Sequence, residues 1–327
     1  MSPSPRLSDC LLRLMPDTSI PPPRIAKPLF GTVGVVGFGL MGSSFARAVR
    51  RAGAARSVIA CDKSAAARRK IADLKLARAV VKSPELMGPV DLVMLATPLG
   101  EYESVFRKLS PALKKGTIVS DVGSVKAPVL GLKKLLPEPG LLVPGHPIAG
   151  TERSGPAAGF GELFTGRYCL LTPDADTDRG AVRRVGRLWR ALGARVEEMS
   201  AEEHDRILSF TSHLPHAAAY ALVHALRDIR GAGAEGDARY AAGGLRDFTR
   251  IAASDPVMWR DVFLANREQV LARLDEYAGV LGRLREAIDR GDGAAMERIF
   301  AETRGYRRSV ERAGQAALDA PIVKGKK

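Results

Sequence analysis

The sequence predicts an α/β protein in which a doubly wound parallel sheet domain is followed by an all-helical domain. In the first half, short β-branched strands alternate with helical segments, and a glycine-rich turn joins the first strand to the first helix. After residue 200 the chain holds only helix-forming segments with apolar residues at helical spacing. We expect a disordered Pro-rich leader over 1–29, the sheet domain over 30–199, the helical domain over 200–313 and a flexible basic tail over 314–327.

Composition and charge favour a globular protein of two domains. The 327 residues are 46% hydrophobic and 26% charged, and no run of about 18 apolar residues predicts a membrane span. Three widely separated cysteines show no metal-ligand spacing, which favours a reduced, cytoplasmic protein without a metal site. The net charge of +14 would suit nucleic acid, but aromatic residues make up only 6% and the cations are scattered. We therefore expect a small anionic ligand and no nucleic-acid partner.

A glycine-rich turn follows the first strand. Residues 32–42 read TVGVVGFGLMG, and a helix is expected over 40–51. Gly37 permits the tight turn, Gly39 lets a pyrophosphate approach the backbone, and Gly42 lets the helix pack closely against the strand. The pattern predicts a Rossmann-type dinucleotide site, with a simple glycine-rich turn as the alternative. The residues expected at the dinucleotide are Gly37, Phe38, Gly39, Leu40, Met41 and Gly42.

The second expected strand ends in an acidic residue. Residues 57–62 read SVIACD, and Asp62 lies 20 residues after Gly42, the separation expected for the carboxylate that binds the adenine ribose. A carboxylate there repels a 2′-phosphate, so NAD is favoured over NADP, although the neighbouring Lys63 leaves some use of NADP open. The alternative for Asp62 is a helix N-cap or turn residue.

Three loops are expected to meet at the edge of the sheet. Further strands are expected at 91–97, 117–122, 141–143 and 168–172, with helices such as 101–109 and 125–136 between them. Ligands of such sheets bind beyond the carboxyl ends of the strands, which brings the loops ATP, DVGSVK and GHPIAG together. This places Thr97 and Pro98 at the cofactor, and Ser124 and His146 at its nicotinamide end.

His146 lies in the stretch GHPIAGTERSG, between a glycine and a proline. These neighbours restrict the backbone and predict an imidazole fixed in a rigid turn. A neutral imidazole in a fixed place is suited to proton transfer near neutral pH. A purely structural turn histidine is the alternative.

The helical half has a polar cluster of its own. Residues 210–220 read FTSHLPHAAAY and contain Ser212, His213 and His216. No Cys, Asp or Glu lies close enough in sequence to complete a metal site, and Pro215 separates the two histidines, so we expect no metal. A capping or core role for either histidine is the alternative to ligand binding.

Arg250 lies in an apolar run that follows a Gly- and Ala-rich break over 231–244, where a mobile loop is expected. A guanidinium in such surroundings needs an anionic partner, and a substrate carboxylate would supply one in bidentate geometry. An internal ion pair with Asp247 or Asp255 is the alternative.

Taken together, the motifs resemble those of the prephenate and arogenate (cyclohexadienyl) dehydrogenases of tyrosine biosynthesis. The motifs are, in order, VGFGLMG, DVGSVK, GHPIAGTERSG, SHLPH and GGLRDFTRIAASDPVMWRD, and the resemblance covers about residues 30–312. It implies a dinucleotide-binding domain, a helical domain that forms a homodimer, and an active site between them. It further implies NAD-dependent oxidative decarboxylation of prephenate to 4-hydroxyphenylpyruvate, with conversion of arogenate to tyrosine as the alternative.

The resemblance also implies roles for single residues. His146 would bind the ring hydroxyl of the substrate and assist its deprotonation, and Ser124 would orient both groups. Arg250 would bind a substrate carboxylate. The residues implied around the substrate pocket or its entrance are Ser212, His213, His216, Glu152 and Asp247.

Three alternatives concern the substrate and the class of protein. The segment 206–222 contains no acidic residue for the ammonium group of arogenate, which favours prephenate, although Glu152 or Asp247 leaves arogenate open. The β-hydroxyacid dehydrogenases use a helical lysine, but the first lysine after residue 200 is Lys324. A non-enzymatic NAD sensor would not require the serine, histidine and arginine to meet in one place.

Overall fold

The computed structural model describes residues 25–151, 153–230 and 240–312. Most of the expected leader, residues 231–239 of the expected mobile loop and the expected tail lie outside the described residues. By their contacts, the residues up to Val270 form one compact unit and those from Leu271 onward form a second. No helix in the described ranges is long and apolar enough to cross a membrane.

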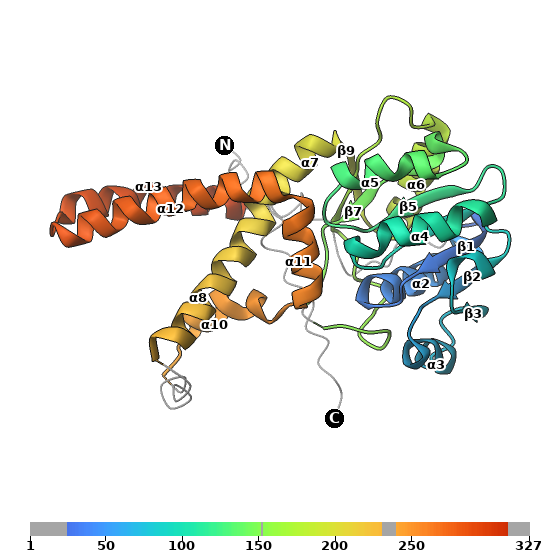
Figure 1. The fold of residues 1–327 in the computed structure, drawn as a ribbon, viewed down its shortest axis with the longest axis horizontal. Coiled ribbons are helices and arrows are strands. Elements are labelled where there is room, and N and C mark those ends of the chain that lie inside the picture. The colour runs from blue at the N-terminus through green and yellow to red at the C-terminus, as the bar shows by residue number, and fades with distance from the viewer. Residues whose placement is uncertain (1–24, 152, 231–239, 313–327) are drawn as a thin grey trace, which may run out of the picture. The chain divides into compact units, whose positions relative to one another are not determined.

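The first unit contains a six-stranded sheet (Figure 1). The order of its strands is β3-β2-β1-β4-β5-β6. Its strands are β1 (Phe30–Val36), β2 (Ala55–Cys61), β3 (Ala79–Val81), β4 (Leu92–Leu95), β5 (Ile118–Asp121) and β6 (Leu142–Val143). All five pairings are parallel. The order reverses between β1 and β4, which is the point where doubly wound sheets bind ligands. The Rossmann-type fold predicted from the sequence is confirmed.

Helices cover both faces of this sheet. They are α2 (Leu40–Ala52), α3 (Ala65–Asp73), α4 (Tyr102–Leu109), α5 (Ala127–Gly131) and α6 (Arg179–Ala191). Along β4, Leu92 and Met94 join the hydrophobic cluster that includes α2 and α6 residues, whereas Val93 and Leu95 join the one that includes α4 and α5 residues. Since successive strand residues point to opposite faces, the apolar run of β4 is explained by burial on both sides.

A separate three-stranded sheet holds His146. It consists of β7 (Gly145–Pro147), β8 (Tyr168–Leu171) and β9 (Arg195–Glu198), with β7 antiparallel to β8 and β8 parallel to β9. His146 is the middle residue of β7 and lies opposite Leu170. The expectation of a rigid turn at His146 is therefore wrong. Glycine and proline are poor strand formers, and only the pairing with β8 makes this segment extended.

Among the described residues after β9, all regular secondary structure is helical. The first unit contains α7 (Ala201–Leu208), a π-helical turn (Ser209–His213), α8 (Leu214–Arg230), α10 (Gly243–Thr249), a 3-10 helix (Arg250–Ala253) and α11 (Pro256–Ala265). Helix α12 (Arg267–Asp289) begins in this unit, and α13 (Gly293–Arg312) belongs to the second. Helices α11 and α12 are separated at Asn266, which ends α11 in a non-helical conformation. The helical second half predicted from the sequence is confirmed.

The last five residues of the expected leader lie against the first unit. The backbone N–H of Ile25 donates to Ala52, and that of Leu29 donates to Ala54. Both side chains also pack against the core cluster that includes α2. These apolar residues attach the segment before β1 to the sheet domain.

Substitution by alanine should destabilise the protein at one glycine of the turn after β1 and have little effect at another. A Cβ on Gly42 would lie 1.9 Å from the carbonyl oxygen of Gly37. Gly42→Ala should therefore lower the free energy of unfolding by about 3 kcal/mol or more, because backbone must move to make room. Gly39→Ala is the control, since its Cβ would meet nothing within 4 Å and should change stability by less than about 1 kcal/mol. Urea unfolding followed by circular dichroism measures both, and equal losses would contradict the packing argument.

Candidate active site

The glycine turn leaves space and unsatisfied polar groups beside the start of α2. Gly37 has a φ of +89°, and a Cβ there would lie 2.6 Å from the carbonyl oxygen of Ala96. Gly39 is the N-cap of α2 and offers no side chain to the first helical N–H groups. In the described part of the chain, the buried hydroxyl of Thr97 makes no hydrogen bond. A ligand carrying phosphate would complete this arrangement, since a helix N-terminus attracts anions and buried polar groups require partners.

Asp62 closes this turn from the end of β2. Its Oδ2 accepts a hydrogen bond from the backbone of Phe38 at 2.9 Å, and its Oδ1 accepts one from Ser64 at 2.8 Å. The turn role that the sequence left open is therefore present, and ribose binding by Asp62 stays a prediction. The nearby cations are engaged, because Lys63 pairs with Glu101 at 2.8 Å and Arg68 donates to two backbone carbonyls.

A buried ion pair joins the loops DVGSVK and GHPIAG. Lys126 Nζ lies 2.5 Å from Asp121 Oδ2, and both side chains are 0% exposed. Asp121 Oδ1 accepts from the N–H of Gly145 at 3.0 Å, while Lys126 Nζ donates to the carbonyl of Gly145 at 2.8 Å. Both backbone polar groups of Gly145 are thus held by the pair. The meeting of these two loops agrees with the sequence-based expectation.

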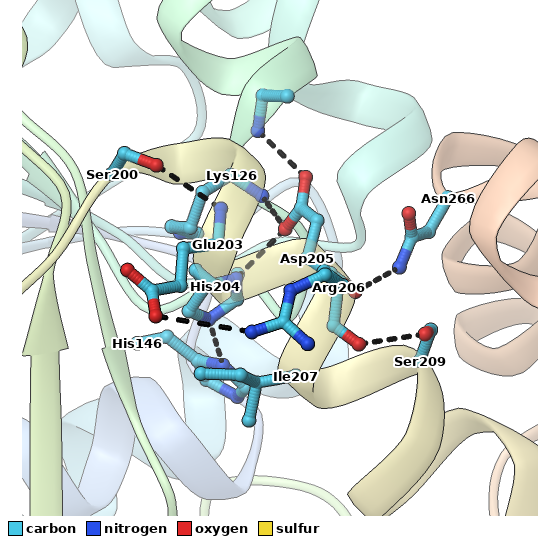
Figure 2. A network of polar contacts seen from close by, with 12 residues as sticks. Lys126, His146, Ser200, Glu203, His204, Asp205, Arg206, Ile207, Ser209 and Asn266 are labelled. Carbon is cyan, nitrogen blue, oxygen red and sulfur yellow. Dashed lines mark hydrogen bonds and ion pairs between the residues drawn. The ribbon is translucent and has the colours of Figure 1, made fainter.

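His146 contacts a second histidine that comes from α7 (Figure 2). His146 Nδ1 lies 2.9 Å from His204 Nε2, and His204 Nδ1 lies 2.7 Å from Asp205 Oδ1. The Asp205 carboxylate also accepts hydrogen bonds from the backbone N–H groups of Lys126 and Ala127, at 2.8 and 2.9 Å. The result is a continuous polar connection from the start of α5, through α7, to β7.

Burial keeps both histidines uncharged near neutral pH. Desolvation lowers the pKa of His146 well below its ordinary value, and repulsion from His204, Lys126 and His213 lowers it further. Desolvation also lowers the pKa of His204, although the Asp205 carboxylate opposes this change. His146 is therefore neutral and has a basic nitrogen available near neutral pH.

Ser124 lies in the DVGSVK loop and is half-buried. Its hydroxyl makes no hydrogen bond to any residue that the structure describes, and the His146 imidazole is held by His204 instead. The orientation of His146 that the resemblance assigns to Ser124 stays a prediction. A role for Ser124 at a substrate hydroxyl stays a prediction.

The two histidines of SHLPH lie at the junction of the π-helical turn and α8. His213 is buried, its Nδ1 lies 3.1 Å from the amide nitrogen of Asn266, and its Nε2 makes no hydrogen bond within the described ranges. His216 stacks on Trp259 with ring centroids 3.5 Å apart, and its Nδ1 donates to the carbonyl of Ser212 at 3.0 Å. Both have structural contacts, and both keep a ring nitrogen for a further partner.

The remaining candidates lie on or near α10. Arg250 begins the 3-10 helix after α10 and is exposed, and its positive charge lowers the pKa of His216, which places the two residues near each other. Asp247 pairs with Arg246 at 3.1 Å, and Asp255 caps α11 by accepting from Met258. Glu152 lies outside the described residues. Among described residues, no group of three or more His, Cys, Asp or Glu side chains could hold a metal ion.

Two family models match most of the chain. Residues 45–198 match the model of the prephenate dehydrogenase nucleotide-binding domain. Residues 200–302 match that of the prephenate dehydrogenase dimerization domain. The chain belongs to the prephenate dehydrogenase family. It is therefore an oxidoreductase by descent.

Relatives with known names align with most of this chain. The chain is 39% identical to cyclohexadienyl dehydrogenase of Zymomonas mobilis over 86% of this chain and 97% of the relative. It is 33% identical to prephenate dehydrogenase of Bacillus subtilis over 88% and 78% of the two chains. The crystal structure of Aquifex aeolicus prephenate dehydrogenase with hydroxyphenyl propionate and NAD⁺ aligns with a TM-score of 0.80 at 36% identity, covering 86% of this chain and 98% of that chain.

Several residues of the candidate site were not identified from the sequence. Asp121 and Lys126 lie inside a motif that was recognised but was assigned only through its serine. His204 and Asp205 are two adjacent titratable residues in a chain with only five histidines, which was an available signal. Asn266 had no signal in the sequence, because its importance depends on the break between α11 and α12.

The buried His213 predicts a loss of stability in mild acid. Desolvation lowers its pKa from 6.5 to about 4, so the unfolded chain binds a proton in this range and the folded chain does not. The free energy of unfolding should be full above about pH 6.5 and fall by about 3 kcal/mol towards pH 4 from this group alone. The free energy of unfolding, measured across this pH range, should change less steeply with pH in His213→Asn than in the parent, by about 1.4 kcal/mol per pH unit. The exposed His224 gives the control His224→Gln, and an unchanged slope in His213→Asn would contradict the assignment.

Proposed function

We propose that the protein is an NAD-dependent prephenate dehydrogenase of tyrosine biosynthesis. The single observation that carries this proposal is a neutral His146 in a fixed position. His204 contacts its ring, and the Asp121–Lys126 pair holds the backbone of Gly145, the residue before it. A neutral imidazole fixed in this position is the group that ionisation of a ring hydroxyl requires.

The cofactor proposal rests on the glycine turn and on Asp62. The open space at Gly39 and the uncapped start of α2 fit a pyrophosphate, and the free hydroxyl of Thr97 fits a further polar contact. Asp62 would accept from the adenine ribose and repel a 2′-phosphate, and the cations beside it are engaged elsewhere. The Aquifex aeolicus relative was solved with NAD⁺. NAD⁺, when bound, accepts the hydride from ring carbon C4 of the substrate.

The residues of this chain would supply binding and proton transfer. His146 accepts the proton of the 4-hydroxyl group, which makes a carbonyl form at C4 as the hydride leaves. Loss of carbon dioxide from the opposite ring carbon then gives the aromatic product 4-hydroxyphenylpyruvate. Because aromatisation drives the decarboxylation, the protein needs chiefly to align the ring and assist ionisation of the hydroxyl.

Substrate binding would involve cationic and polar residues of the helical segments. Arg250 is proposed to bind a carboxylate, and it lies near the free ring nitrogen of His216. Ser212 and His213 are proposed to line the same pocket, and Ser124 to bind the hydroxyl. Asp247 and Glu152 are proposed to lie at its entrance.

The charge distribution favours prephenate over arogenate. Arogenate carries an ammonium group, which in a buried pocket requires a carboxylate. Asp205 is buried and its carboxylate is satisfied by His204, Lys126 and Ala127, and Asp247 is paired with Arg246. Cyclohexadienyl dehydrogenase, the name of the Zymomonas mobilis relative, makes dual specificity the second candidate.

A homodimer is proposed for the helical half. The family model that matches 200–302 is described as a dimerization domain. Large apolar side chains of α12 and α13 are exposed, among them Ile288 at 60% and Phe300 at 55%. Exposed apolar surface of this kind is typical of subunit interfaces.

A side-by-side assay with two substrates tests the proposed function. Absorbance of the reduced nicotinamide, followed with NAD⁺ and either prephenate or arogenate, should show kcat/KM at least about tenfold higher for prephenate, because an ammonium group without a carboxylate partner is unfavourable in a buried pocket. A faster reaction with arogenate would contradict the substrate assignment. Turnover of neither substrate would contradict the function itself.

Replacing His146 separates proton transfer from binding. In His146→Asn the amide takes the place of Nδ1 and can keep the contact with His204, whereas the basic Nε2 is lost. We expect kcat to fall by about 10²- to 10⁴-fold, the usual contribution of a general base. The Kd of NAD⁺, measured by fluorescence titration, should stay within about threefold of the parent value. A variant that keeps most of its kcat would show that His146 is not the base.

A further inference from the structure

His146 is the first of three residues in a buried chain of hydrogen bonds (Figure 2). Its Nδ1 contacts His204 Nε2 at 2.9 Å, and His204 Nδ1 contacts Asp205 Oδ1 at 2.7 Å. His204 is 0% exposed and Asp205 is 4% exposed. Of these three residues, only His146 touches the substrate in the proposed function, so the other two act there only through His146.

The proton positions along this chain follow from the chemistry of each atom. A carboxylate only accepts hydrogen bonds, so His204 Nδ1 carries a proton and donates it to Asp205. Because burial lowers the pKa of His204, the ring is neutral and its Nε2 carries a lone pair. That lone pair accepts from His146 Nδ1–H. A neutral His146 with its proton on Nδ1 has its own lone pair on Nε2.

We propose that His204, oriented by Asp205, is a positioning residue that holds His146 in the tautomer whose Nε2 accepts the substrate's hydroxyl proton. The proposal rests on the proposed function, because His204 acts only through His146. In this step the hydroxyl O–H bond breaks and an N–H bond forms at His146 Nε2. The resulting imidazolium keeps its Nδ1–H bond to His204, and no further reactant is needed.

Asp205 is fixed firmly enough to serve as the end of this chain. Its carboxylate accepts from the N–H groups of Lys126 and Ala127, and its backbone carbonyl accepts from the Asn266 amide at 2.8 Å. If the carboxylate turned away, the backbone N–H groups of Lys126 and Ala127 at the start of α5 would lose their partner, which is unfavourable for a polar group removed from water. The other charged groups that act on His204 are Lys126 and Asp121, which are paired with each other.

A purely structural role for His204 makes a different prediction. As a space-filling residue between α7 and β7, it would need only bulk. As a tautomer-fixing residue, it needs a hydrogen-bond acceptor at the position of Nε2. Glutamine offers a carbonyl oxygen near that position, whereas leucine offers similar bulk without an acceptor.

Kinetics of two variants distinguish these roles. His204→Leu should lower kcat for prephenate by about 10²-fold or more, the lower end of a general-base contribution, while KM and the Kd of NAD⁺ stay within about threefold. His204→Gln should keep kcat within about tenfold of the parent. His224→Gln makes the same change at an exposed histidine of α8 and should leave kcat unchanged. Equal losses in the leucine and glutamine variants, or no loss in the leucine variant, would overturn the proposal.

A spectroscopic measurement on the parent protein tests the tautomer directly and uses a variant only to assign the signals. The chain has five histidines, so proton–nitrogen correlation spectra of ¹⁵N-histidine-labelled parent protein can resolve each ring. Comparison with His146→Asn assigns the His146 signals. We expect its proton on Nδ1, and a proton on Nε2 would overturn the proposal.

The two proposals fail in distinguishable ways. If the parent protein reduces NAD⁺ with neither substrate, the proposed function fails. The spectrum still reports which ring nitrogen of His146 carries the proton. If the parent turns over prephenate but the His204→Leu variant keeps its kcat, the function stands and the positioning role is wrong.

Discussion

The buried pair of Asp121 and Lys126 is the contact on which the rest of the candidate site depends. Each charge is 0% exposed, and together they bind both backbone polar groups of Gly145, the residue before His146. Asp121 also accepts from the Tyr102 hydroxyl and the Gly123 N–H. Removing one partner of a buried pair costs about 3–5 kcal/mol because the other charge is left unpaired. The position of His146 is therefore tied to the integrity of the sheet edge.

Lys126 of this pair also contributes to the charge state of the site. The positive charge of Lys126 lowers the pKa of both His146 and His204, in addition to the larger effect of desolvation. A residue that anchors the loop thus also keeps the imidazoles neutral. Structural and electrostatic roles coincide because the low dielectric of the interior strengthens each interaction of a buried charge. Conversely, loss of Lys126 would alter the position and the basicity of His146 together.

Most of the fold was predictable from local patterns, whereas much of the site was not. The glycine turn, the buried strands and the meeting of the DVGSVK and GHPIAG loops follow from residue spacing and from parallel-sheet geometry. The strand β7 was missed because glycine and proline flank His146, and its pairing with β8 is a tertiary contact. His204 was missed because a histidine on a helix resembles any core histidine until its partners are known.

The π-helical turn allows histidines before and after it to contact different parts of the site. A π-turn adds a residue to the helical repeat, so that residues before and after it face differently than in a continuous α-helix. His204 on α7 therefore points to His146, while His213 in the turn contacts Asn266 and His216 on α8 stacks on Trp259. A regular helix through this segment would change the register between these contacts. Local irregularity of this kind is common at functional sites, where local preference gives way to the placement of polar groups.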